Sequence, residues 1–141
     1  RIILDADGSI FEKSNLNLFN NSSSEVIVFT RVKYDNLPSH VTLITPKEFS
    51  IKEILSEIAK LGIQSVYVEG GPSIHDQFLA SGYWDEVITY ISPILLGGNN
   101  TSSFTRNRIT NEKIQLHNTK ITKLGEDIRI SGRRVSQCLQ D

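Results

Sequence analysis

The residues best suited to chemistry lie together at positions 69–73, which read Glu-Gly-Gly-Pro-Ser. Two adjacent glycines let the backbone approach a ligand closely, and a helix that begins there offers N–H groups and the positive end of its dipole. The stretch therefore suits a phosphate or pyrophosphate held at Gly70, Gly71, Ser73 and Ile74. It also fits a tight strand-to-helix turn with Pro72 as the first helical residue.

Further polar residues follow other apolar runs of the sequence. Glu69 precedes the glycines, where a carboxylate can hold a substrate or accept hydrogen bonds from nearby backbone N–H groups. Thr30 and Arg31 follow the run 26–29, and a guanidinium there would suit the 2′-phosphate of NADP(H) because its forked donors bind phosphate bidentately. The alternative for Arg31 is a solvated strand end. Asp5, after the run 1–4, likewise fits either a ligand-binding residue or a solvated strand end.

Other classes of site have little support in the sequence. His40, His75 and His117 are scattered, with no ligand spacing to one another or to Cys138, the single cysteine, so we expect no metal site. His75 reads as a helix cap or a side chain that faces solvent. No Walker, G-x-S-x-G or G-x-G-x-x-G pattern is present.

The composition narrows the class of protein. The 141 residues include 38% hydrophobic and 22% charged ones, which is typical of one soluble globular domain. The net charge of -1 argues against bulk electrostatic binding of nucleic acid. No apolar run is long enough to span a bilayer, so we expect no membrane partner. The chain contains no methionine and opens on Arg1 in an apolar run, which suggests a piece of a longer protein.

The elements that must position these residues follow from the hydrophobic pattern. Short runs of β-branched and other apolar residues predict strands that are covered on both faces. Helical spacing and a Ser50–Glu53 capping box predict a helix ending near Gly62. Alternation near the C-terminus predicts an antiparallel hairpin around Gly125. The predicted strands are 1–4, 26–29, 41–44, 65–68 and 85–92; the helices are 50–61 and 74–80; the hairpin arms are 113–123 and 127–131; and the loops are 14–24 and 95–108. The order predicts a three-layer α/β fold with a mostly parallel mixed sheet.

Two segments of this pattern resemble a known family. The run 65–73 (SVYVEGGPS), followed by a short helix and then 84–98 (WDEVITYISPILLGG), resembles the C-terminal reductase domain of the bifunctional riboflavin-biosynthesis deaminase–reductase. The openings 1–5 (RIILD) and 28–30 (VFT) and the tail 125–129 (GEDIR) resemble it too. The resemblance extends from Arg1 to about Arg134 and implies a dihydrofolate-reductase-like fold.

The resemblance also implies an activity and a set of site residues. Members use NADPH to reduce the ribosyl group of 5-amino-6-(5-phosphoribosylamino)uracil to the ribityl chain. It implies catalytic positions for Glu69, near the nicotinamide, and for Asp5. It implies that the cofactor lies against the following residues: Thr30, Arg31, Gly70, Gly71, Pro72, Ser73, Leu96 and Gly97, with Leu95 helping to wall the cleft. A cytoplasmic homodimer or higher homo-oligomer is the corresponding expectation.

Two parts of the family pattern are absent from these 141 residues. They are the zinc deaminase domain and the first part of the reductase domain, so we expect residues 1–141 to be an incomplete reductase domain that lacks activity by itself. Two alternatives stay open. One is a reductase of the same fold that acts on another pteridine or pyrimidine, and the other is a non-catalytic piece that oligomerises through the strand 85–92 and the hairpin.

Overall fold

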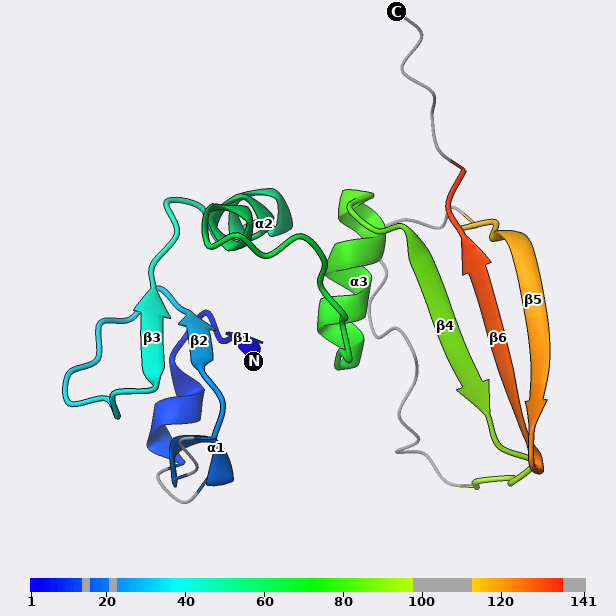
Figure 1. Ribbon diagram of the computed structural model, residues 1–141, viewed down its shortest axis with the longest axis horizontal. Coiled ribbons are helices and arrows are strands. Elements are labelled where there is room, and N and C mark those ends of the chain that lie inside the picture. Colours follow the sequence, from blue (N-terminus) through cyan, green and yellow to red (C-terminus); the bar gives the residue numbers. More distant parts are fainter. Residues whose placement is uncertain (14–15, 21–22, 98–112, 136–141) are drawn as a thin grey trace, which may run out of the picture. The chain divides into compact units, whose positions relative to one another are not determined.

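The computed structural model describes residues 1–13, 16–20, 23–97 and 113–135 (Figure 1). The chain forms two compact units, Arg1–Val66 and Tyr67–Asp141. Each unit has its own three-stranded sheet, and we describe them one at a time. The α/β fold class predicted from the sequence is confirmed, with parallel strands in the first unit and antiparallel strands toward the C-terminus.

The first unit contains a parallel sheet with strand order β1-β2-β3. The strands are β1 (Ile2–Leu4), β2 (Val26–Phe29) and β3 (Val41–Ile44). In register, Leu4 lies opposite Phe29, and Phe29 lies opposite Ile44. The carboxyl ends of all three strands therefore meet at one edge, where an open α/β sheet binds its ligands.

Both faces of this sheet are covered, which explains why its strands are apolar without alternation. On one face Val26, Val28 and Val41 pack with Phe11 from the 3-10 helix η1 (Ser9–Glu12) and with the short helix α1 (Asn17–Asn20). On the other face Phe29 packs against Ile54 and Ile58 of α2 (Ile51–Lys60). The first unit is thus a three-layer structure in which neighbouring strand residues serve opposite cores.

Helix α2 begins and ends as its sequence predicts. The Ser50 hydroxyl accepts a hydrogen bond from the Glu53 backbone N–H at 3.3 Å, which caps the first turn. Gly62 follows the helix with φ of 79°, a left-handed conformation that favours glycine. These two signals place the helix so that its apolar stripe lies on the sheet.

The second unit consists of α3 (Pro72–Ser81) and an antiparallel sheet of order β4-β6-β5. Its strands are β4 (Glu86–Ile91), β5 (His117–Leu124) and β6 (Asp127–Arg133). The predicted hairpin is confirmed, with Gly125 at φ of 63° in its turn. None of the described helices has the length and apolar character that crossing a membrane requires.

Two local predictions are wrong. Residues 65–68 have the composition of a strand but form none. Neither sheet in the described part of the chain includes them. Within the predicted loop 14–24, Asn17–Asn20 instead form α1, whose Leu18 and Phe19 pack on the core of the first unit. Most of the predicted loop 95–108 lies outside the described residues.

Candidate functional site

The ends of β1 and β2 bring three predicted site residues together in the first unit. The Asp5 backbone N–H donates to the Phe29 carbonyl at 3.0 Å, and the Arg31 N–H donates to the Ala6 carbonyl at 3.2 Å. These bonds continue the parallel ladder past the ends of both strands. Asp5, Thr30 and Arg31 therefore share the carboxyl edge of the sheet.

Asp5 is held by its own turn. One carboxylate oxygen accepts a hydrogen bond from the Ile10 backbone N–H at 2.8 Å, and the other accepts one from the Ser9 hydroxyl at 3.1 Å. Gly8, with φ of 76°, allows the chain to reverse between these partners. The carboxylate thus orders the turn that leads from β1 into η1.

Thr30 and Arg31 differ sharply in exposure. Thr30 is fully buried, and its hydroxyl accepts a hydrogen bond from the Val32 N–H at 3.2 Å, so it shapes the backbone after β2. Arg31 is exposed, and its guanidinium carbon lies 5.1 Å from the centre of the Phe49 ring. Stacking on an aromatic face orients a guanidinium while leaving its N–H donors accessible. Arg31 is therefore the member of this group that can meet an anion.

The start of α3 carries the other predicted residues, all within the second unit. Glu69, Gly71 and Ser73 are exposed. Gly71 occupies the N-cap position without a side-chain cap, and Pro72 is at the first helical position, as predicted. A Cβ built on Gly71 would meet no atom within 4 Å. This ten-residue helix thus begins at an open, uncapped N-terminus, which is a favourable place for an anion.

Gly70 has a different environment from Gly71. Its φ is 86°, the peptide bond between the two glycines is cis, and the ring of His75 occupies the space where a side chain on Gly70 would lie. Sequence reasoning missed this role of His75. A usable signal exists: side chains in a helix point back toward its N-terminus, so a residue in the first turns can reach the preceding loop.

The remaining candidates are exposed or lie outside the described residues. Leu95 and Leu96 are 100% and 79% exposed, and Gly97 is exposed as well. Cys138 lies outside the described residues. Within the described ranges, no cluster of three or more His, Cys, Asp or Glu side chains could hold a metal ion.

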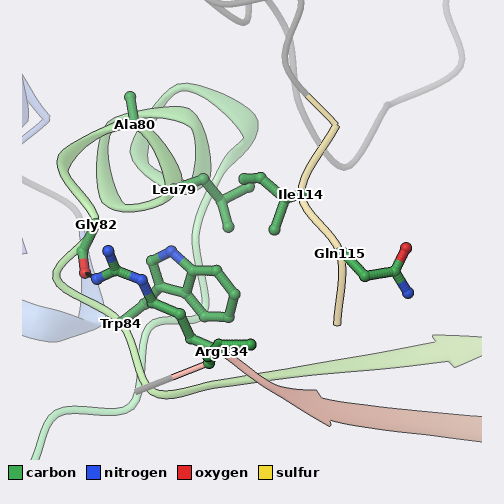
Figure 2. Close-up of a pocket in the computed structure, with 8 residues that line it drawn as sticks. Leu79, Ala80, Gly82, Trp84, Ile114, Gln115 and Arg134 are labelled. Atoms are coloured by element: carbon green, nitrogen blue, oxygen red, sulfur yellow. Dashed lines mark hydrogen bonds between the residues drawn. The ribbon is translucent and has the colours of Figure 1, made fainter. Parts of the chain in front are cut away.

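Two hollows in the structure lie apart from these residues. Figure 2 shows the larger one, of about 390 Å³, where Leu79, Trp84, Ile114 and Arg134 converge at the C-terminal end of α3. The Arg134 guanidinium is held there by a hydrogen bond to the Gly82 carbonyl. The smaller one, of about 170 Å³, lies in the first unit beside Phe11. Neither hollow is lined by a predicted site residue, so each unit keeps its own candidate position: the β1–β2 edge in the first unit and the open turn before α3 in the second.

Comparison with known proteins adds the family. Residues 1–130 match the family described as the RibD C-terminal domain. The chain is 33% identical over 146 aligned residues to the riboflavin biosynthesis protein RibD of Bacillus amyloliquefaciens, covering 93% of this chain and 38% of that protein. It is 28% identical to RibD of Aquifex aeolicus, covering 95% of this chain and again 38% of the relative. The chain thus spans well under half the length of these curated relatives.

Solved structures agree with this match. The Thermotoga maritima deaminase/5-amino-6-(5-phosphoribosylamino)uracil reductase matches 95% of this chain and 37% of its own, at a TM-score of 0.73 and 25% identity. The Saccharomyces cerevisiae riboflavin biosynthesis reductase Rib7 shares the fold at a TM-score of 0.70 and 20% identity, covering 94% of this chain and 68% of its own. Because the family match extends over nearly the whole chain, the chain belongs to the RibD C-terminal domain family.

Proposed function

We propose that this chain forms the reductase part of a riboflavin-biosynthesis enzyme and acts in the NADPH-dependent reduction of 5-amino-6-(5-phosphoribosylamino)uracil to its ribitylamino product. The family match supports the reaction class. The observation that carries the assignment on this chain is the exposed, uncapped start of α3 directly after Glu69 and the two glycines.

Residues in each of the two units, taken separately, fit one part of a nicotinamide dinucleotide. The open space beside Gly71 leaves room for a pyrophosphate, and the first turn of α3 would hold it through the Ser73 N–H and the helix dipole, with Pro72, which has no N–H, as the first helical residue. Arg31 would hold the 2′-phosphate, oriented by Phe49, while the buried Thr30 shapes the backbone that carries it. When bound, the cofactor supplies the hydride. We keep Leu96 and Gly97 as candidate neighbours of the cofactor.

The protein's own contribution is placement. Reduction adds a hydride to C1′ and a proton to the nitrogen of the C1′=N double bond in the ring-opened Schiff base, so the protein must align two ligands and exclude water rather than form a covalent bond. Glu69, an exposed carboxylate beside the proposed pyrophosphate site, would orient the substrate and handle its proton. Asp5 would act on the site through the turn that it orders.

A direct test follows NADPH fluorescence as the protein is titrated, with NADH as the comparison. We expect binding of NADPH well below millimolar concentration, and absence of binding at millimolar NADPH would refute the proposal for this chain. Turnover of the phosphoribosylaminouracil by the full-length protein, compared with turnover of dihydrofolate, then separates the proposed substrate from another pteridine or pyrimidine. A zinc-deaminase motif in the adjoining coding sequence would support its place in a cytoplasmic deaminase–reductase.

We also propose association between copies, which one feature of the second sheet supports. The edge strand β5 carries Lys120 and Lys123, which discourage strand pairing, whereas the opposite edge strand β4 has charge only at Glu86. Tyr90 of β4 is 58% exposed. We expect analytical ultracentrifugation to show a homodimer. Thr89→Lys, which places a charge on β4, should weaken the association. Association without NADPH binding would instead favour an oligomerising role alone.

A further inference from the structure

We propose that His75 is a positioning residue: its imidazole packs on Gly70 and so fixes the turn that presents Glu69 and Gly71. The inference rests on the proposed function for the ligand it assigns to this turn, the pyrophosphate of a dinucleotide. Its structural half, that the ring orders the glycine pair, can be tested in the ligand-free protein.

The contact is closer than ordinary packing on a residue with a side chain would allow. A Cβ built on Gly70 would lie 2.3 Å from both Cε1 and Nε2 of His75 and 2.9 Å from Cδ2. The edge of the imidazole therefore occupies the position of a side chain at residue 70. Gly71, the next residue, has nothing within 4 Å of its own Cβ position. One glycine of the pair is packed, and the other is open.

The backbone joins the same residues by a second route. The His75 N–H donates to the Gly71 carbonyl at 3.1 Å, which places His75 in the first turn of α3. Its side chain is half-buried. His75 thus contacts both glycines: its ring packs on Gly70, and its backbone N–H is bonded to the Gly71 carbonyl. A change in the turn would have to move both contacts.

These two contacts matter because a glycine pair has more conformational freedom than any other dipeptide. A ligand that binds to a freely moving Gly70–Gly71 segment must order it, and the lost entropy weakens binding. Packing of His75 on Gly70 orders the segment in advance. In this account the imidazole acts through its packing on Gly70, so a planar side chain of similar reach should replace it.

The experiment compares His75→Ala and His75→Gln, with Gln77→Ala as a control at an exposed position of the same helix. The dissociation constant for NADPH comes from fluorescence, and ¹⁵N relaxation reports the Gly70 and Gly71 amides without ligand. We expect His75→Ala to raise the dissociation constant about tenfold, with order parameters falling from about 0.85 to below about 0.6. His75→Gln and Gln77→Ala should stay within about threefold of the original protein with ordered glycines.

A double-mutant cycle gives a second measurement that does not depend on His75→Ala alone. Gly70→Ala should weaken NADPH binding strongly, and it should weaken it less when His75→Ala has already removed the ring from the new methyl group. Gly125→Ala has φ of 63° in the original protein and open space around it, so its effect should add to that of His75→Ala without coupling.

The outcomes separate this inference from the proposed function. If the original protein binds NADPH while His75→Ala binds equally well with ordered glycines, the positioning role is wrong and the function stands. Equal losses in His75→Gln and His75→Ala would overturn the argument that packing by a planar side chain orders the turn. If the original protein binds no NADPH, the proposed function fails, and the relaxation data still decide whether His75 orders the turn.

Discussion

The polar groups of the two units are used in opposite ways. In the first unit the Asp5 carboxylate accepts hydrogen bonds from Ile10 and Ser9, and the buried Thr30 hydroxyl accepts one from Val32. In the second unit Glu69 and Gly71 are exposed, and α3 starts without a side-chain cap. The difference indicates that the first set stabilises the protein's own turns, whereas the second is available to a ligand. Each prediction below tests one side of that contrast.

The largest effect is expected from Glu69→Gln. If Glu69 orients the substrate and handles its proton, kcat should fall by about 10² to 10⁴, because proton transfer by a positioned group contributes that much. The dissociation constant for NADPH and the thermal midpoint should change little, since the side chain is exposed. Steady-state kinetics, NADPH fluorescence and thermal unfolding of the full-length protein measure the three quantities.

The matched control is Glu126→Gln, an exposed glutamate in the hairpin turn that should leave all three quantities unchanged. A Glu69→Gln protein with normal kcat would remove Glu69 from the chemistry. A large loss of NADPH affinity with normal kcat would instead make Glu69 part of the cofactor site.

Arg31 gives the next largest effect, and it tests the exposed member of the first unit. Arg31→Gln should raise the dissociation constant for NADPH about 10- to 100-fold, the usual value of a charge-assisted, bidentate contact, and leave NADH affinity nearly unchanged. Phe49→Leu should produce a smaller loss of the same selectivity, because it removes the ring that orients the guanidinium. The NADPH-to-NADH affinity ratio is the measurement.

Lys33→Gln is the control for this pair, since Lys33 is a nearby exposed cation in the same unit. A loss of selectivity in Lys33→Gln equal to that in Arg31→Gln would show general attraction of the anion by positive charge rather than recognition at Arg31.

Asp5 should matter for stability more than for binding. Asp5→Ala removes the acceptor for the Ile10 N–H and should lower the free energy of unfolding by about 1–2 kcal/mol, as for other lost caps. Asp5→Asn keeps one acceptor and should cost less. Denaturant unfolding followed by circular dichroism measures both. If Asp5→Asn abolished turnover without loss of stability, Asp5 would be a catalytic residue in its own right.

Much of the first unit could be predicted from local sequence. The apolar runs that became β1, β2 and β3 are covered on both faces, and Ser50 and Gly62 set the limits of α2 through bonds and angles that act within a few residues. Interactions between residues close in sequence therefore determine these elements. The four residues of α1 escaped because asparagine and serine dominate the composition there, while the packing of Leu18 and Phe19 depends on distant residues.

The site was predictable only in part, for the same reason. The uncapped start of α3 after the glycines follows from Pro72 and Gly71 themselves. By contrast, a strand needs a ladder partner, which the composition of residues 65–68 does not guarantee. The hydrogen bond that the Asp5 carboxylate accepts from the Ile10 N–H depends on the turn at Gly8. The packing of His75 on Gly70 depends on a left-handed backbone angle that the sequence permits without requiring.

The smallest effect concerns pH and the turn that contains Asp5. Hydrogen bonding with the Asp5 side chain, and then with the Ser9 backbone N–H, holds the pKa of Asp7 below its usual value of 3.8. A lowered pKa means that the unfolded chain binds a proton more readily. The stabilisation is therefore complete above pH 3.8 and decreases as the pH falls below that value. Because Asp7 is fully exposed, solvent and salt reduce the effect.

Asp7→Asn should lower the denaturant midpoint slightly at pH 6, and the difference from the original protein should narrow by pH 3. Asp35→Asn, which changes an exposed carboxylate elsewhere in the first unit, should show no such narrowing. An Asp7→Asn difference that is equal at both pH values would mean that the Asp7 charge does not stabilise the turn, and the contrast between the two units would then rest on Asp5 and Thr30 alone.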